Sequence, residues 1–299
     1  MSLSLRVIFV FLWTVSASLG ADVVVAAYNL ENYLRMDRRA KGETVADAPK
    51  PEHEVAAIVR ILSEIKPDIL GLMEIGGPDM LDDLQSRLRA SGLDFPYRVW
   101  VQGADEERHL ALLSRFPITQ DRSLDDVSFP LNGRIQRMPR GILDATVQVN
   151  PGYELRLLGA HLKSKRTTPD YDQSRLRERE ADQLRKHVDG VLQKQPSTNL
   201  LLFGDLNDTK NEYPIRQIMG PPRAPTSLRD IWLRDSRGET WTHYWKTADI
   251  YSRIDYILVS PALAPEVIWK KCGINDSPSW KDASDHRAIY ATISPTDRR

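Results

Sequence analysis

Polar residues of a few types stand beside apolar segments at six separate places in this 299-residue chain. Four are carboxylates, two are histidines and two are asparagines. Carboxylate and amide oxygens without thiolates suit a hard divalent cation, and histidines can donate hydrogen bonds to a phosphoryl oxygen. The combination favours metal-assisted hydrolysis of a phosphate ester. The segments are YNLEN with Asn29, LGLMEI with Glu74, LLGAHLKSK with His161, LLFGDLND with Asp205 and Asn207, RIDYILVS with Asp255, and SDHRAI with Asp285 and His286.

A single carboxylate at the end of a strand is more often a helix cap or a turn residue than a functional group. Six such endings together are harder to explain in that way. Polar groups at the carboxyl ends of adjacent strands meet in one crevice, which is the usual ligand site of α/β sheets. The sequence therefore predicts one shared pocket. Zinc is disfavoured there, because the chain has neither an HExxH helix nor a pair of cysteines.

The segments around these motifs predict alternating strands and helices. Apolar residues at helical spacing predict helices over Glu52–Ile65, Asp79–Ala90 and Ser174–Gln193. Two long polar segments, 35–51 and 163–171, are predicted to be loops. Because helix-flanked strands and hairpin-like pairs both occur, we expect two sheets packed face to face with helices outside, in one domain. The predicted strands are Val23–Tyr28, Ile69–Met73, Tyr97–Val101, Leu110–Leu113, Ile142–Val149, Glu154–Ala160, Asn199–Phe203, Ile254–Val259, Val267–Trp269 and Ala288–Ile293.

Composition is that of an ordinary globular protein, with 41% apolar and 27% charged residues. This excludes collagen-like, coiled-coil and wholly disordered chains. The 41 basic and 41 acidic side chains cancel, so any nucleic-acid binding must come from local patches. The only cysteine, Cys272, cannot form an internal disulfide and is interpreted as structural.

The first twenty residues have the pattern of a secretory signal peptide. Arg6 precedes an apolar run over 7–13, and small and polar residues follow up to Gly20. The run is shorter than the roughly 20 residues that span a bilayer. An N-terminal core strand or helix is the alternative. We predict cleavage before Ala21, with Ala17 as a second option. The prediction is then a mature domain over 21–299 without a membrane span, in a periplasmic or secreted protein.

The six motifs, in this order from residue 29 to residue 286, resemble the endonuclease/exonuclease/phosphatase superfamily. That superfamily includes pancreatic-type deoxyribonucleases, apurinic endonucleases, inositol polyphosphate phosphatases and bacterial sphingomyelinases. GDLND and SDHR, joined by RIDYIL, are the most specific parts of the resemblance. It implies a four-layer α/β/β/α sandwich, in agreement with the predicted elements, and a phosphoesterase that depends on Mg²⁺, Mn²⁺ or Ca²⁺.

The resemblance also implies roles for individual residues. Glu74 would be the main metal ligand with Asn29 and Asp285 nearby, and Glu31 stands where some members have a metal-site carboxylate. Asp205 would orient the attacking water and Asn207 would bind the scissile phosphate. His286, oriented by Asp255, and His161 on the leaving-group side would contact the phosphate. We expect both histidines to act as imidazolium donors, with the pKa of His286 raised by Asp255.

The substrate is less strongly indicated. Arg115 in LLSRFPI, Arg140 in PRGIL, and Lys163 and Lys165 after His161 are candidate phosphate contacts, although such residues also occur on solvated surfaces. A late aromatic cluster is predicted to pack a core or brace a loop; stacking on unpaired bases and contact with lipid are the alternatives. Its members are Trp241, Tyr244, Trp245, Tyr251 and Trp280.

An exported nuclease acting on DNA or RNA is the function that the sequence favours. A sphingomyelinase-like lipid phosphodiesterase is the alternative, although no exposed apolar hairpin for membrane insertion is evident; a phosphomonoesterase is another. A non-catalytic binding protein of the same fold is disfavoured, because no core motif is missing. No obligate protein partner is indicated.

Overall fold

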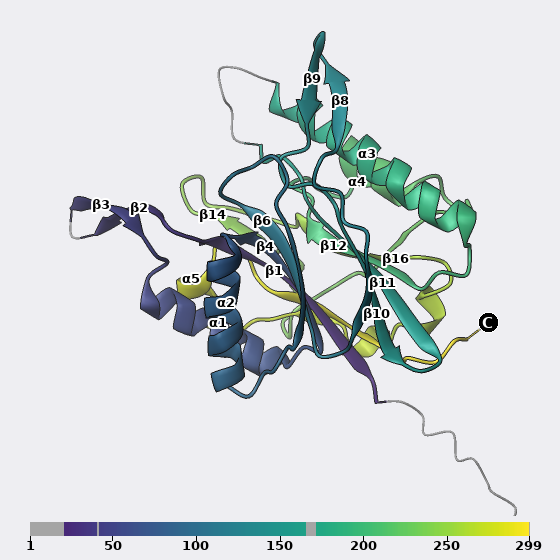
Figure 1. The fold of residues 1–299 in the computed structure, drawn as a ribbon, viewed down its shortest axis with the longest axis horizontal. Coiled ribbons are helices and arrows are strands. Elements are labelled where there is room, and N and C mark those ends of the chain that lie inside the picture. The colour runs from purple at the N-terminus through teal and green to yellow at the C-terminus, as the bar shows by residue number, and fades with distance from the viewer. Residues whose placement is uncertain (1–20, 41, 166–171, 299) are drawn as a thin grey trace, which may run out of the picture.

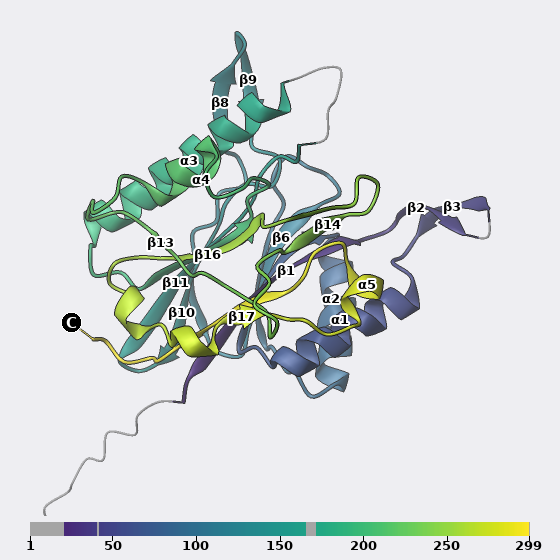
Figure 2. The same ribbon diagram turned by 180° about the vertical axis from the view of Figure 1, so that it is seen from behind.

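Two six-stranded sheets form the centre of the computed structural model, which describes residues 21–40, 42–165 and 172–298 (Figures 1 and 2). The segment 1–20, predicted to be a signal peptide, lies outside the described residues, as does most of the predicted loop 163–171. The first sheet has the order β17 (Gly273–Ile274), β18 (Ile289–Ile293), β1 (Val23–Tyr33), β4 (Ile69–Ile75), β6 (His109–Ser114) and β5 (Tyr97–Val101). The second has the order β13 (Arg229–Asp230), β16 (Asp255–Val259), β12 (Leu200–Asp205), β11 (Tyr153–His161), β10 (Leu143–Asn150) and β7 (Ile118–Asp121).

Each sheet has one parallel pair at its centre, β1 with β4 and β11 with β12, and antiparallel neighbours around it. Side chains alternate along these strands, so one face of each sheet packs against the other sheet. Val25 and Ala27 of β1 belong to this central core, whereas Ala26 and Tyr28 point to the outer face. The ring of Phe203 in β12 occupies the space beside Gly71 in β4, where a Cβ would lie 2.1 Å from it.

Helices cover both outer faces (Figures 1 and 2). α1 (Glu52–Ile65) and α2 (Pro78–Ala90) bury their apolar sides on the first sheet, and α3 (Gln173–Lys194) and α4 (Tyr213–Met219) bury theirs on the second. The predicted helix, sheet, sheet, helix architecture is confirmed. A short helix, α5 (Trp280–Ala283), follows β17. In the described part of the chain, no helix is long and apolar enough to cross a bilayer.

Two of the predicted elements are wrong. The segment 35–51 is not a loop but contains a hairpin of β2 (Met36–Ala40) and β3 (Glu43–Ala48), whose exposed residues leave no apolar pattern in the sequence. Val267–Trp269 is not a strand, because it makes a single bridge to Ile293 between two short 3₁₀ helices, Ala264–Glu266 and Trp269–Lys271. Two further hairpins are β8 (Ser128–Leu131) with β9 (Arg134–Arg137), which projects from the body in Figure 1, and β14 (His243–Trp245) with β15 (Ile250–Ser252).

Candidate active site

Strand register in the second sheet aligns three of the predicted residues in one row. His161 at the end of β11 pairs with Asp205 at the end of β12, and Asp205 pairs with Asp255 at the start of β16. Asp255 begins its strand because β16 runs antiparallel to β12. Gly204 permits the close approach of β11 and β12, since a Cβ there would lie 1.9 Å from the carbonyl oxygen of Ala160.

In the first sheet, bulges in neighbouring strands position Glu31, Asn32 and Glu74. The register of β1 with β4 shifts between Asn29 and Tyr33, and that of β4 with β6 shifts between Met73 and Ile75. Within these shifts Glu31, Asn32 and Glu74 have left-handed backbone conformations, with φ of 46°, 60° and 60°. Bulges and such strained conformations are concentrated next to active sites, where they redirect side chains.

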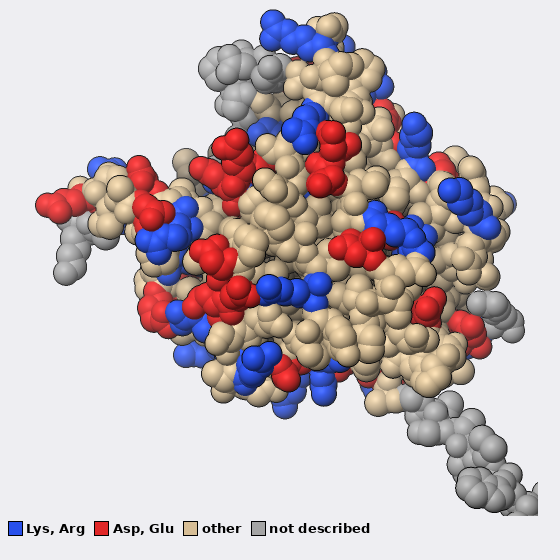
Figure 3. All heavy atoms as spheres, in the orientation of Figure 1, with Lys and Arg blue, Asp and Glu red and all other residues tan. Residues whose placement is uncertain are grey.

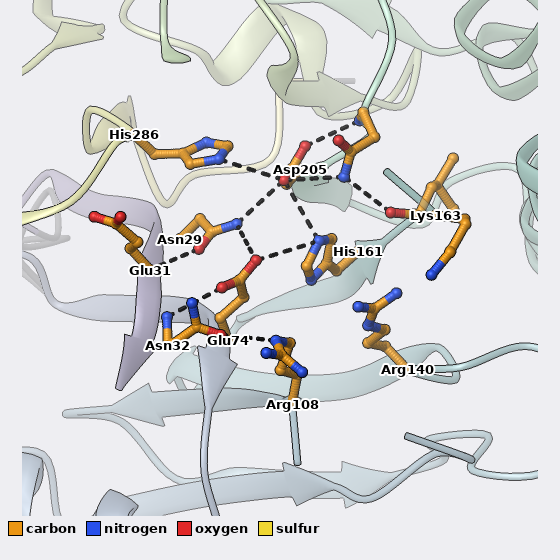
Figure 4. A network of polar contacts seen from close by, with 12 residues as sticks. Asn29, Glu31, Asn32, Glu74, Arg108, Arg140, His161, Lys163, Asp205 and His286 are labelled. Atoms are coloured by element: carbon orange, nitrogen blue, oxygen red, sulfur yellow. Dashed lines mark hydrogen bonds and ion pairs between the residues drawn. The ribbon is translucent and has the colours of Figure 1, made fainter. Parts of the chain in front are cut away.

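Side chains from both sheets converge on Asp205 (Figure 4). Asn29 Nδ2 donates hydrogen bonds to Asp205 Oδ2 at 3.1 Å and to Glu74 Oε1 at 3.3 Å. His161 Nε2 lies 3.5 Å from Asp205 Oδ2 and 3.8 Å from Glu74 Oε1. Asn207 Nδ2 donates to Asp205 Oδ2 at 3.1 Å and to the carbonyl of Leu162 at 2.9 Å.

The loop before β18 brings the last two predicted residues to the same place. His286 shares a 2.8 Å hydrogen bond between its Nδ1 and Asp255 Oδ2, and its Nε2 lies 3.6 Å from Asp205 Oδ2. The backbone N–H of Asp285 donates to Glu31 Oε2 at 2.9 Å. Ser284 fixes this loop to β1, because its hydroxyl donates to the carbonyl of Asn29 at 2.8 Å.

The two histidines have opposite electrostatic environments. Burial opposes protonation of His286, but the carboxylates of Asp255 and Asp205 outweigh burial and raise its pKa well above the usual value. Burial and the nearby Arg140 guanidinium hold the pKa of His161 well below the usual value. His161 is therefore a neutral imidazole at neutral pH. The expectation of two imidazolium donors is wrong, and only His286 fits that part.

The carboxylates of the site are suited to a cation. Burial raises the pKa of Asp205 to about 8, and burial together with Asp285 raises that of Glu31 to about 7. Carboxylates whose ionised forms are disfavoured in this way are stabilised by a divalent cation beside them. Glu74, Asn29, Glu31 and Asp285 supply oxygen donors and no thiolate, which fits a hard ion. His243, Asp285 and His286 also form a group whose ligand atoms lie within 4.8 Å of one another.

Basic side chains lie on the other side of the site (Figure 4). Arg108 Nε donates to Asn32 Oδ1 at 2.7 Å, and Arg140 Nη2 lies 3.3 Å from Asp105. Arg140 is buried, yet its Nε and Nη1 have no hydrogen-bond partner among the residues that the structure describes. Burial and Arg140 together lower the pKa of Lys163. Buried guanidinium donors without partners indicate that an anion belongs beside them.

The other predicted phosphate contacts are placed differently. Arg115 is not at the site, because it follows β6 and pairs with Asp68 at 2.8 Å, at the end of β4 opposite to Glu74. Lys165 pairs with Asp208 at 2.6 Å. On the face seen in Figure 3, basic and acidic side chains are interspersed, in keeping with the zero net charge.

Three residues of the site were missed by the sequence analysis. Asn32 donates its backbone N–H to Glu74 Oε2 at 3.0 Å, and Arg108 holds the side chain of Asn32. The ring of His243 lies 4.7 Å from that of His286. Asn32 was visible as the last residue of YNLEN. No sequence motif indicated Arg108 or His243. Arg108 precedes β6 and His243 begins β14, and only the structure shows where these strands start in space.

Comparisons with known proteins identify the fold and the family. The Endonuclease/Exonuclease/phosphatase family model matches residues 26–286. No curated protein matches the sequence. Similar solved structures include truncated Caenorhabditis elegans TDP2, with 18% identity, a TM-score of 0.58, and 92% of this chain and 99% of that chain covered. The human Nocturnin catalytic domain with bound sulfate anion has 16% identity, a TM-score of 0.60, and 93% and 96% covered. Sphingomyelinase C from Streptomyces griseocarneus has 17% identity, a TM-score of 0.60, and 91% and 99% covered.

Proposed function

We propose that this chain, which belongs to the endonuclease/exonuclease/phosphatase family and is a metal-dependent hydrolase of phosphoric esters, is a nuclease. One observation carries the proposal: Asp205 Oδ2 lies within 3.6 Å of nitrogen atoms of four other predicted site residues. Asn29 comes from the first sheet, His161 from β11, Asn207 from the turn after β12, and His286 from the loop before β18. Such convergence of distant segments supports a catalytic role.

A bound divalent cation would be held by Glu74, with Asn29, Glu31 and Asp285 close by, and would supply Lewis-acid stabilisation of the phosphoryl oxygens. Mg²⁺ is our first choice and Mn²⁺ or Ca²⁺ the alternatives, because all three prefer oxygen ligands. The identity of the ion is part of the proposal.

The side chains of the site have complementary roles in the proposed reaction. Asp205 orients the attacking water, and its raised pKa suits a group that accepts a proton from that water. His286, kept protonated by Asp255, donates a hydrogen bond to the phosphoryl group as negative charge develops on it. Asn207 binds the scissile phosphate through its amide, and neutral His161 contacts the leaving-group side.

The basic side of the site supports a phosphodiester with further phosphates. Arg140 and Lys163 lie beyond His161, where they would contact a phosphate adjacent to the scissile one. Such contacts position a polyanion without reading its bases. Because the molecule has no net charge, this local patch would supply the attraction for DNA or RNA.

A lipid phosphodiesterase is the second candidate, and one observation favours it. The β14–β15 hairpin exposes Trp245, Ile250 and Tyr251, whereas the sequence had shown no obvious apolar hairpin. Exposed aromatic and aliphatic side chains on a hairpin are also found where proteins contact lipid.

Export is a further part of the proposal. Arg6, the apolar run over 7–13 and the small residues up to Gly20 support a signal peptide that is cut before Ala21. Sequencing of the N-terminus of protein recovered from outside the cytoplasm tests this directly. Ala21 or a nearby small residue is the expected first residue, and an intact Met1 would contradict export by this route.

Hydrolysis assays test the proposed activity. The purified protein should release acid-soluble nucleotides from DNA or RNA with Mg²⁺, and chelation should abolish the release. Asp205→Asn should lower turnover by about 10³-fold or more, since general bases contribute about 10²–10⁴-fold and this residue also holds four neighbours. Asp189→Asn, at an ion pair on α3, is the control and should retain activity. Cleavage of sphingomyelin with DNA and RNA left intact would refute the nuclease function.

A further inference from the structure

A cleft of about 810 Å³ lies directly beside the proposed metal site and shares Glu31 and Asp285 with it. One wall is formed by the β2–β3 hairpin and the segment before α1. The other is formed by the β14–β15 hairpin and α5. The volume lies within the range of sites that hold small ligands or parts of larger ones. Because two carboxylates are common to both sites, a group in the cleft would be next to the reacting phosphate.

The second wall is a set of aromatic rings that hold one another in place. Tyr244 and Tyr251 are stacked, with centroids 4.4 Å apart and planes 23° apart. Trp241 packs edge-on against Tyr251 at 4.8 Å and against Trp280 at 5.0 Å. Although these rings pack together, Tyr251 is still 51% exposed, and the neighbouring Trp245 is 53% exposed. Preset rings can bind a planar group with little ordering cost.

Cationic side chains stand on both walls of the cleft, Arg39 on the β2–β3 wall and Lys246 and Lys281 on the aromatic wall. Arg39, Lys246 and Lys281 line the cleft and are exposed, and in the described segments no carboxylate forms an ion pair with them. Two acids of the cleft are engaged within the protein: Glu54 pairs with Lys50 at 2.9 Å, and Asp37 accepts from the backbone N–H of Asp47 at 3.1 Å. Asp282 also lines the cleft and faces solvent. With Glu31 and Asp285, the cleft lining has five acidic and five basic side chains, so the positive charge available to a phosphate backbone is local, at Arg39, Lys246 and Lys281.

We propose that this cleft binds an unpaired nucleotide next to the scissile phosphate, so that the protein prefers single-stranded nucleic acid. The inference rests on the nuclease function proposed above. Aromatic side chains stack on any base whose face is free, and cations beside them follow the phosphate backbone. Bases within a duplex are stacked on their neighbours and cannot offer a free face to Tyr251 or Trp245.

A lipid surface fits the hairpin less well. Its turn carries Lys246 and Asp249, and Asp249 accepts a hydrogen bond from the Tyr244 hydroxyl at 3.0 Å. Insertion of the turn into a bilayer would bury both charges, which is unfavourable. Tyr244 and Trp280 line the cleft rather than standing at the tip of the hairpin.

Steady-state kinetics on three substrates test the inference. With Mg²⁺, Tyr251→Ala and Trp245→Ala should each raise KM for a single-stranded oligonucleotide by about tenfold, as expected for loss of one base stack. Hydrolysis of methyl p-nitrophenyl phosphate, which has no base, should be unchanged. Wild type should cleave the single strand with a higher kcat/KM than the same sequence as a duplex. The ratio of these two kcat/KM values should be smaller in both variants.

Two control variants separate stacking from structural damage. Tyr251→Phe keeps the ring and should behave as wild type. Trp269→Ala removes a partly exposed tryptophan that packs against Arg229 outside the cleft, and should not change KM. Unchanged KM for the single strand in both alanine variants, with wild type cleaving DNA normally, would overturn the inference and leave the nuclease function standing. A blue shift of Trp245 fluorescence with phosphatidylcholine vesicles that is lost in Trp245→Ala would also overturn it, in favour of lipid. Failure of wild type to cleave any nucleic acid would instead refute the nuclease function.

Discussion

Replacement of Asp255 by asparagine tests the electrostatic arrangement around His286. The substitution keeps the shape of the side chain and an oxygen that can accept from Nδ1, but it removes one negative charge 2.8 Å from the imidazole. Burial lowers the pKa of His286, and in the variant only Asp205 and Asp285 remain to raise it. This pKa must therefore fall. His286 would lose its proton at a lower pH, and the alkaline limb of the kcat profile should move to lower pH.

The size of the effect follows from the interaction that is lost. Two unit charges about 4 Å apart interact by about 4 kcal/mol at the effective dielectric constant of a protein, which would correspond to about 10³-fold in rate. Asp205 remains 3.6 Å from Nε2 and preserves part of the stabilisation. We therefore expect kcat to fall by about 10²- to 10³-fold near pH 8 and by less near pH 6.

The assay is hydrolysis of methyl p-nitrophenyl phosphate with saturating Mg²⁺ between pH 6 and 9, together with NMR titration of the His286 ring. Asp144→Asn is the control, because Asp144 contacts Nε2 of His187 at 2.8 Å and also accepts from Arg156, on the side of the second sheet that α3 covers. It should lower thermal stability without changing kcat per folded molecule. An Asp255→Asn protein with wild-type kcat and an unchanged pH profile would refute the reasoning.

Three further predictions concern the fold and the metal site. Glu180 is buried with a pKa raised to about 7, so its carboxyl is neutral in the folded state and ionised in the unfolded state between about pH 4.5 and 7. The free energy of unfolding should therefore fall as pH rises through that window, by at most about 3 kcal/mol. Glu180→Gln should remove this dependence, as measured by urea titrations at several pH values. Parallel pH curves for both proteins would contradict this. Gly204→Ala should force β11 and β12 apart, and so cost about 1–3 kcal/mol of stability and most of the activity. Gly190→Ala on α3 is the control. Its added methyl meets open space, so it should not destabilise the protein. Glu74→Gln should raise the Mg²⁺ concentration for half-maximal rate by about tenfold or more, and an unchanged metal dependence would remove Glu74 from the ligand set.

The sequence predicts the architecture well where burial leaves a periodic pattern. The bounds predicted for α1 are those observed, Glu52–Ile65. Except for Val267–Trp269, the predicted strands are found, and their ends agree within two residues apart from the longer carboxyl end of β1. The convergence of Glu74, His161, Asp205 and His286 was also predictable, since each lies beside an apolar strand. The β2–β3 hairpin was not, because its mostly exposed residues leave no apolar alternation in the sequence.

Features that depend on strand direction or on spatial neighbours were beyond the sequence. A motif around Arg115 gives no information on which end of the sheet it occupies, and the antiparallel pairing of β6 with β4 places it opposite to Glu74. The neutrality of His161 results from burial and from Arg140, which is distant along the chain. Likewise, the aromatic residues near 241–251 and 280 were predicted to pack or brace, and the structure shows that they pack together while also lining an open cleft.

Glu74 and its neighbours are proposed to hold a divalent cation where side chains of both sheets converge. Anomalous diffraction from crystals soaked with Mn²⁺ is the decisive measurement. We expect an anomalous peak within coordination distance of the Glu74 carboxylate, close to Asn29 and Asp285, that disappears in Glu74→Gln. A strong peak bound elsewhere on an active enzyme, with this pocket empty, would contradict it.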